Sequence, residues 1–412
     1  MTTTSNPTPI PEQHTLWLAL ALALSLGAAV SLGVTRFAYG LLLPTMRTDL
    51  GWSYTLAGAM NTANALGYLL GALATPRLMQ RLGPARLLLG GAVLASVFMV
   101  LSGFFVDAAP LLVQRLLAGV ASAFVFIAGG LLAARLAALQ PRRSGFLLGL
   151  YYGGTGFGIV LSALLVPVVL EAAHARPHGW AWAWWALAGA CLLGTAVLGW
   201  PARALAHLNA PGPAVASTTA AGANESGPRH FAWRDFSYSL AGYTLFGVGY
   251  IGYMTFVIAL LREQGASASA VTLFYALLGV AVVLSSRIWA GLLDRFKGGQ
   301  ALAILNGVLG VATVLPALTS SWPVVLASGL LFGGVFLSVV ASTTALVRHN
   351  LPQGAWATGI SAFTVVFAAG QIVGPTIVGL IADGPGGLSR GLVFSAGALW
   401  VGAALAWRQR PL

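Results

Sequence analysis

The feature that most constrains this chain is its succession of apolar runs, each long enough to cross a lipid bilayer. A helix needs about 20 mostly apolar residues for one crossing. Only 7% of the 412 residues are Asp, Glu, Lys or Arg, whereas soluble domains carry roughly 25%. The sequence therefore predicts an all-α integral membrane protein with twelve transmembrane helices. The twelve runs cover residues 16–45, 54–78, 86–106, 109–136, 145–170, 180–200, 236–261, 269–293, 301–319, 323–347, 356–381 and 391–407.

The basic residues indicate the orientation. The net charge of +12 does not predict nucleic-acid binding, because the basic residues stand singly between apolar runs. Twelve crossings put both chain ends on one side, which then holds fourteen Lys and Arg residues against four on the other. Cytoplasmic loops carry such an excess, so we expect both termini in the cytoplasm of a bacterium, with the protein in the inner membrane. Nothing basic precedes the first run and no small-residue cleavage site follows it, so we expect this helix to be retained.

One segment, residues 201–234, interrupts the hydrophobic rhythm. It is rich in Ala, Pro, Gly, Ser and Thr and has no periodic apolar face, which predicts a flexible cytoplasmic linker. The linker follows the sixth run. We therefore expect an N-terminal six-helix bundle at 1–200 and a C-terminal six-helix bundle at 235–412, pseudo-symmetric as an internal duplication would make them.

Two loops resemble a known signature. PRLMQRLGPARLLL follows the second run and AGLLDRFKGGQALAIL follows the eighth, and both are similar to the G-x-L-x-D-R-x-G loop of the major facilitator superfamily. The second loop keeps Asp294 and Arg295, and the first keeps Arg81 but has Gln80 in place of Asp. The resemblance implies that these residues form a gate latch between helices. RFAYGLLLPTMRTDLGWS, at residues 36–53, is similar to the uncharacterised YbfB/YjiJ-like branch, which implies a transporter fold but no particular substrate.

Two arginines lie deep inside predicted helices. Arg36 is ~7 Å outward of the middle of the first helix and Arg287 ~8 Å to the cytoplasmic side of the middle of the eighth, at about 1.5 Å per residue. A charge in hydrocarbon costs at least about 2.5–3.5 kcal/mol, and no carboxylate lies at that depth. A guanidinium can bind a carboxylate or phosphate through two parallel hydrogen bonds. We therefore expect Arg36 and Arg287 to hold an anionic substrate between them. The alternatives are bonding to helix-end carbonyls for Arg36 and snorkelling for Arg287.

Resemblance adds two expectations. RIWAGLLD, which begins at Arg287, resembles the pattern by which monocarboxylate and oxalate transporters of the superfamily place a substrate arginine. RLLAG, which begins at Arg115, resembles the superfamily motif associated with proton coupling. Snorkelling of Arg115 from the outer end of its helix is the alternative. Asp107, also at an outer end, is a candidate carrier of the coupled proton.

Further polar residues recur at helical spacing, so that each set shares one face of its helix. They are candidate substrate contacts, and hydrogen bonds between helices, worth about 0.6 kcal/mol each, are the alternative for any one of them. The candidates are Tyr39, Asn61, Asn64, Tyr68, Tyr243, Tyr250, Thr364 and Gln371.

No catalytic or metal-binding motif accompanies these residues. The chain has no GxxxxGK[ST], HExxH or CxxC pattern, so we expect neither an enzyme nor a metal or other cofactor. The favoured function is secondary active transport of a small organic anion, most simply a carboxylate, by alternating access. The alternative is a proton-coupled exporter of drugs or neutral metabolites. The expected partners are the substrate and the lipid bilayer, without nucleic acid, and we expect a monomer. A receptor or integral enzyme is a third class, which no signalling domain or catalytic cluster supports.

Overall fold

The computed structural model describes residues 11–140, 143–206 and 231–412. Most of the predicted linker, at 207–230, lies outside the described residues. The chain forms these elements in order: α1 (Pro11–Ala28), η1 (Ala29–Phe37), α2 (Tyr39–Leu50), α3 (Tyr54–Leu82), α4 (Pro84–Ser102), α5 (Ala108–Ala138), α6 (Ser144–Ala172), α7 (Trp180–Ala206), α8 (Ser237–Glu263), α9 (Ala268–Ile288), α10 (Ala290–Arg295), α11 (Gln300–Leu318), α12 (Trp322–Asn350), η4 (Gln353–Ala355), α13 (Trp356–Ala382) and α14 (Gly387–Trp407).

The all-helical prediction is confirmed, since the described part of the chain contains no strand. Eleven helices of that part are long and apolar enough to cross a membrane, and the first of these runs through α1, η1 and α2. The twelfth long helix is α3, which has 29 residues but is less apolar because it carries two asparagines and two arginines. It packs against α5 on one side and α13 on the other. Its two asparagines, Asn61 and Asn64, are therefore buried between neighbouring helices, whereas Arg77 and Arg81 are exposed.

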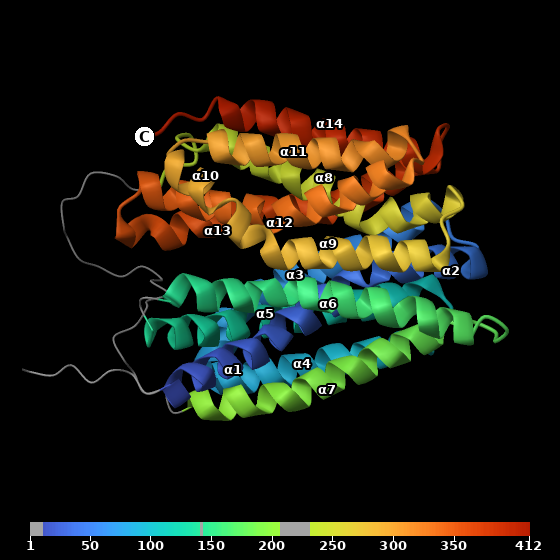
Figure 1. Cartoon of the computed structure of the whole chain (residues 1–412), viewed down its shortest axis with the longest axis horizontal. Helices are drawn as coiled ribbons and strands as arrows, with labels where there is room; N and C mark the ends of the chain where they lie inside the picture. Colours follow the sequence, from blue (N-terminus) through green and yellow to red (C-terminus); the bar gives the residue numbers. More distant parts are fainter. Residues whose placement is uncertain (1–10, 141–142, 207–230) are drawn as a thin grey trace, which may run out of the picture.

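The helices form two groups (Figure 1). The first group is built on contacts of α3 and α4 with α5 and of α1 with α6, and the second on contacts of α8 and α11 with α14 and of α9 with α12. The groups meet mainly where α6 packs on α9 and α3 packs on α13. The start of α1 and the C-terminus lie at the same end of the protein. We call this the terminal end, and the other the opposite end.

Glycines permit the close approach of the two groups. A Cβ atom on Gly156 of α6 would collide with the carbonyl oxygen of Gly279 on α9. On the other side of the interface, a Cβ atom on Gly58 of α3 would collide with the carbonyl group of Pro375 on α13. Small residues at such crossings allow backbones to approach closely, so larger side chains at these positions would force the groups apart.

Hydrogen bonds seal the interface at the opposite end. The Asp383 carboxylate, directly after α13, accepts hydrogen bonds from the backbone N–H of Tyr54 (2.7 Å), the N–H of Thr55 (2.8 Å) and the Thr55 hydroxyl (2.6 Å). These N–H groups lie in the first turn of α3 and have no partner within their own helix. The Tyr54 hydroxyl donates to the Glu263 carboxylate, and the Arg47 guanidinium lies 3.7 Å from the centre of the Tyr54 ring. The second group of helices therefore caps a helix of the first.

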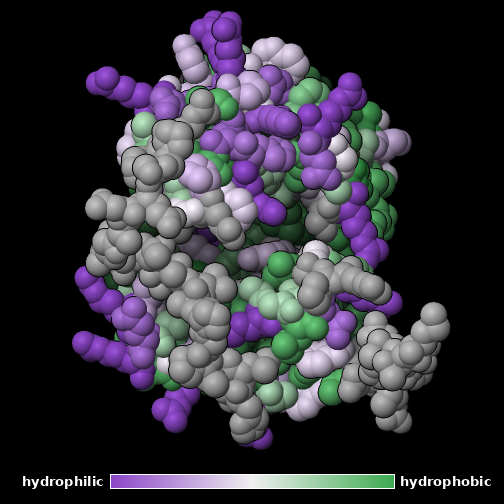
Figure 2. Space-filling model, turned by 90° about the vertical axis from the view of Figure 1, so that its left-hand side faces the viewer, coloured by the Kyte–Doolittle hydropathy of each residue, from purple (hydrophilic) through white to green (hydrophobic). Residues whose placement is uncertain are grey.

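At the terminal end, the two groups of helices are separated. Figure 2 shows this face, where hydrophilic side chains gather around a hollow between the two groups. Arg81, Asp294 and Arg295 are exposed, and within the described ranges no ion pair joins them. The two groups are thus bonded together at the opposite end and parted at the terminal end.

Candidate functional site

The first crossing is interrupted by a π-helix. The segment η1 has nine residues, of which eight are buried, and Arg36 stands in its last turn. The Thr35 hydroxyl donates to the carbonyl oxygen of Val30, five residues earlier (2.6 Å). Gly33 packs so closely on Gly158 of α6 that a Cβ atom would not fit. π-Helical turns are rare and frequently mark functional sites, and this one holds an arginine inside the protein.

The Arg36 side chain is only 3% exposed. Its Nε and Nη2 atoms are buried and have no hydrogen-bond partner, and no Asp or Glu within the described residues forms an ion pair with it. The hydroxyl groups of Tyr68 and Tyr250 lie close enough to interact electrostatically with its charge. Arg36 is therefore a buried cation with free hydrogen-bond donors, set between a tyrosine of α3 and one of α8.

Arg115 is held differently, and the snorkelling alternative for it is wrong. Its side chain is 2% exposed, and it donates from Nη1 to the carbonyl oxygen of Thr35 (2.8 Å) and from Nη2 to Oδ1 of Asn61 (3.1 Å). The guanidinium also lies 5.0 Å from the ring centre of Tyr39 and 5.5 Å from that of Trp184. Polar and aromatic groups of neighbouring helices thus stabilise Arg115 inside the bundle, so its side chain has no need to reach toward the membrane surface.

The Arg115 network continues into the second group of helices. Asn61 donates from Nδ2 to the Thr255 hydroxyl of α8 (2.8 Å), and Asn64 donates from Nδ2 to the backbone carbonyl of Arg115 (3.1 Å). A line of hydrogen bonds therefore runs from η1 through α5 and α3 to α8. The two asparagines predicted to contact substrate serve this network.

The expectation of a second buried arginine is wrong. Arg287 is exposed, and its guanidinium lies 4.9 Å from the ring centre of Phe146. It is the penultimate residue of α9, because that helix ends at Ile288 and Trp289 separates it from α10. The predicted helix continued to residue 293, which placed Arg287 too near the middle. Arg287 and Arg36 therefore do not form a pair of buried cations.

Stacked aromatic rings form the wall of the site on the second group of helices. The Tyr250 ring lies nearly parallel to those of Phe336 (centres 5.2 Å apart, 19°), Phe246 (4.9 Å, 22°) and Phe367 (5.5 Å, 23°). Tyr243 stacks on Phe367 in turn (4.9 Å, 22°). Phe367 remains partly exposed. This wall is a set of ring faces contributed by α8, α12 and α13.

The first group supplies a looser aromatic wall. Phe126 of α5 lies 6.5 Å from Tyr68 of α3, and 6.1 and 5.7 Å from Tyr151 and Tyr152 of α6, measured between ring centres. Tyr68 is partly exposed. Since Tyr68 and Tyr250 both interact with Arg36, the buried cation lies between two aromatic surfaces.

Other residues that were predicted to contact the substrate form hydrogen bonds within the protein. The Tyr250 hydroxyl donates to Oε1 of Gln371 (2.9 Å), which joins α8 to α13. The Tyr39 hydroxyl donates to the carbonyl oxygen of Ala57 (2.8 Å). Thr364 is exposed and donates to the carbonyl four residues earlier in its own helix. Of the eight polar candidates, Tyr68, Tyr250 and Gln371 are thus associated with the surroundings of Arg36.

Sequence reasoning missed several residues of the site. Phe336, Phe367, Phe126 and Tyr152 lie in strongly apolar runs, where the sequence does not distinguish a ring that faces lipid from one that faces the centre. Thr255 was missed because one hydroxyl in such a run carries little signal. A usable signal was the three- and four-residue spacing of Tyr243, Phe246 and Tyr250 in α8, which places their rings on one face.

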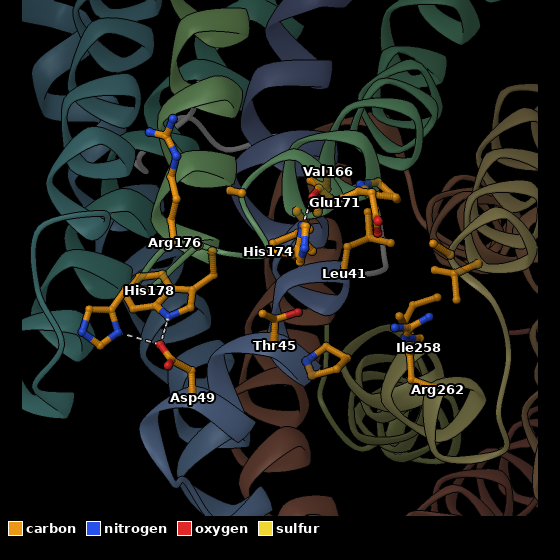
Figure 3. A pocket seen from close by; sticks show the side chains of 18 of the residues that line it. Leu41, Thr45, Asp49, Val166, Glu171, His174, Arg176, His178, Ile258 and Arg262 are labelled. Carbon is orange, nitrogen blue, oxygen red and sulfur yellow. Dashed lines mark hydrogen bonds and ion pairs between the residues drawn. The ribbon is translucent and has the colours of Figure 1, made fainter.

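Two further carboxylates, Asp107 and Asp49, lie at the opposite end. Asp107 precedes α5, is exposed and caps no N–H group with its side chain. Asp49 accepts hydrogen bonds from Nδ1 of His178 (2.6 Å) and Nε1 of Trp180 (2.6 Å). Figure 3 shows His178 pointing toward Asp49 beside a cavity of about 370 Å³ that residues of both helix groups line. This cavity belongs to the sealed end and does not include Arg36.

Two groups of long helices that are sealed together at one end, parted at the other and hold a buried cation define a multi-pass membrane transporter of the major facilitator fold. The chain belongs to the family described as "Uncharacterised MFS-type transporter YbfB", whose sequence profile matches residues 28–407. The predicted family and fold are therefore confirmed. A search among curated proteins finds no match by sequence.

Solved structures agree on the fold. One is a bacterial homologue of the human lysosomal transporter Spinster in an inward-facing and unoccupied conformation, with a TM-score of 0.66 and 17% identity over 97% of each chain. Another is described as such a homologue in an inward-facing and occupied conformation, with a TM-score of 0.65 and 15% identity, again over 97% of each chain. At these identities the similarity establishes the fold and leaves the substrate open.

Proposed function

We propose that this protein is a secondary transporter that moves a small organic anion across a bacterial inner membrane, with Arg36 as the residue that binds the anion. The observation that carries the proposal is the Arg36 guanidinium, 3% exposed and with two buried nitrogens that lack partners. A charge in the membrane interior costs at least about 2.5–3.5 kcal/mol. An anion that binds both nitrogens offsets this cost, and a guanidinium is suited to such two-point binding.

The surroundings of Arg36 support an exogenous anion. Arg115, the other buried cation among the described residues, already donates to Thr35 and Asn61. From Thr15 onward, no Asp, Glu or His in the described part of the chain is buried. The protein therefore offers Arg36 no counter-ion, whereas a substrate can.

The two ends of the interface support alternating access. The hydrogen bonds of Asp383 hold the helix groups together at the opposite end, while the groups are parted at the terminal end. With the termini in the cytoplasm, as the distribution of basic residues indicates, this conformation faces inward. In our proposal the six-helix halves, 1–200 and 235–412, rock about Arg36 to expose it to each side in turn.

The test is binding of organic anions to the purified protein, followed by thermal unfolding. A ligand at 100 times its Kd stabilises the folded state by about 2.7 kcal/mol. We expect such stabilisation from an organic anion in the wild type and its loss in Arg36→Ala. Arg390→Ala, which removes an exposed arginine at the opposite end, is the matched control and should behave as wild type.

The alternative function predicts a different result. If neutral metabolites or cationic dyes stabilise the protein, anions do not, and Arg36→Ala binds as the wild type does, the chain is an exporter and the proposal is wrong. Uptake of the stabilising anion into proteoliposomes then distinguishes transport from binding alone.

A further inference from the structure

We infer that the substrate is an aromatic monocarboxylate: one negative charge on a flat apolar body. The inference rests on the proposed function, because it takes the Arg36 site as the substrate site. It goes further by naming the chemical class that this site accepts.

The number of free buried cations limits the charge of the substrate. Arg36 has unpartnered donors, whereas Arg115 is engaged by Thr35 and Asn61. Arg287 is exposed at the end of α9. A dicarboxylate at Arg36 would therefore keep a second charge unpaired in the membrane interior, which is unfavourable. A single carboxylate matches the single free guanidinium.

The aromatic walls limit the shape of the substrate. Tyr250 stacks within 23° of parallel on Phe246, Phe336 and Phe367, and Phe367 is the partly exposed ring of this set. On the first group, Tyr68 interacts with Arg36. Arg36 and Tyr250 are 3% and 2% exposed, so a substrate bound to Arg36 contacts protein on most sides. A flat ring that stacks on Phe367 adds a further aromatic pair, which a saturated ring of the same carbon number cannot do.

The hydrogen-bonding groups limit the polarity of the substrate. The Tyr250 hydroxyl is engaged by Gln371, and its neighbours Phe246, Phe336 and Phe367 have no polar atoms. A sugar or polyhydroxy acid would lose its hydrogen bonds to water against this wall without replacement. The wall of the second group therefore selects an apolar body, and Arg36, with the Tyr68 hydroxyl near it, supplies the polar contacts that a carboxylate needs.

The experiment compares the affinities of four test compounds for the full-length purified protein. Benzoate is the aromatic monoanion, cyclohexanecarboxylate its saturated counterpart, terephthalate the aromatic dianion and benzamide the neutral aromatic. We expect benzoate to bind about 2- to 10-fold more tightly than cyclohexanecarboxylate, the worth of one aromatic pair. Terephthalate and benzamide should bind at least tenfold more weakly than benzoate.

Variants assign the selectivity to the aromatic wall. Phe367→Leu removes a partly exposed ring that stacks on Tyr250, and it should make benzoate and cyclohexanecarboxylate bind equally while both still require Arg36. Phe394→Leu, an exposed phenylalanine of α14, is the control and should keep the preference. If Phe367→Leu misfolds, Tyr68→Leu tests the other wall with the same readout.

The outcomes separate this inference from the proposed function. Equal binding of benzoate and cyclohexanecarboxylate by the wild type, or equal binding of terephthalate, overturns the inference and leaves an anion transporter. Binding of benzamide as tight as that of benzoate, unchanged in Arg36→Ala, overturns the proposed function as well.

Discussion

Removal of the Asp383 carboxylate should open the sealed end of the protein. The carboxylate accepts three hydrogen bonds from the start of α3, and all three cross between the helix groups. A hydrogen bond contributes about 0.5–1.5 kcal/mol net, and the lower part of that range applies because Asp383 is exposed. Asp383→Ala should therefore weaken closure by about 1.5–2 kcal/mol, or about 10- to 30-fold in the equilibrium between closed and open states.

Thiol labelling measures this shift. The one native cysteine, Cys191, is buried and is replaced by Ser for the assay. A cysteine at Thr376, whose hydroxyl contacts that of Thr62 between α13 and α3 (2.8 Å), reports opening in the detergent-solubilised protein. We expect Asp383→Ala to accelerate its labelling about 10- to 30-fold. Asp383→Asn should have a smaller effect because it keeps one acceptor oxygen.

Asp107→Ala provides the matched control, because Asp107 is also exposed at the opposite end but caps no N–H group with its side chain. Its labelling rate should equal that of the parent. An unchanged rate in Asp383→Ala, or an equal acceleration in Asp107→Ala, would refute the role of these hydrogen bonds in closure.

Further predictions concern pH, binding, stability and coupling. Burial raises the pKa of the Asp383 carboxyl, but hydrogen bonds from Thr55 and Tyr54 outweigh this effect and hold the pKa below its ordinary 3.8. The closed state is therefore intact above pH 3.8 and is lost only as the pH falls through the lowered pKa. The rate of Thr376→Cys labelling, corrected for thiolate content, should be constant from about pH 8 to 5. Arg36→Lys should lower anion affinity at least tenfold because an ammonium cannot donate two parallel bonds, whereas Arg287→Lys should leave the Kd within about twofold; equal losses in isothermal titrations would contradict the site. Arg115→Leu should lower the thermal stability by about 1–3 kcal/mol for each of the two acceptors it leaves unpaired, and an unchanged melting temperature would contradict the network. Anion exchange across preloaded proteoliposomes should be nearly independent of pH between about 6 and 8, because no Asp, Glu or His of the described helices from Thr15 onward is buried. A strong pH dependence would contradict this reasoning.

The fold could be predicted from the sequence because membrane crossing imposes length and polarity on each helix separately. The predicted runs agree with the observed helices to within a few residues at most ends. The larger differences arise where a predicted helix is interrupted within its length. The first run contains η1, and the eighth is broken at Trp289, and neither change has a strong local signal.

The site could be predicted only in part. The buried position of Arg36 could be predicted because a cation in an apolar run without a counter-ion is unusual, and this is visible in the sequence alone. The position of Arg287 could not be predicted in the same way, because its depth depends on where α9 ends. The surroundings of Arg115 could not be predicted either. Its partners Thr35 and Asn61 come from two other helices and are brought to it only by packing.

The seal formed by Asp383 also determines which substitutions the chain can tolerate. Two of its three hydrogen bonds come from backbone N–H groups at positions 54 and 55. Any amino acid other than proline supplies such a donor, so substitutions at positions 54 and 55 preserve most of the seal. Position 383 has no such freedom, because the acceptor oxygens belong to its side chain. Neutral variation should therefore accumulate at positions 54 and 55 while position 383 stays fixed. Divergent homologues can then keep the same gate although different residues begin α3.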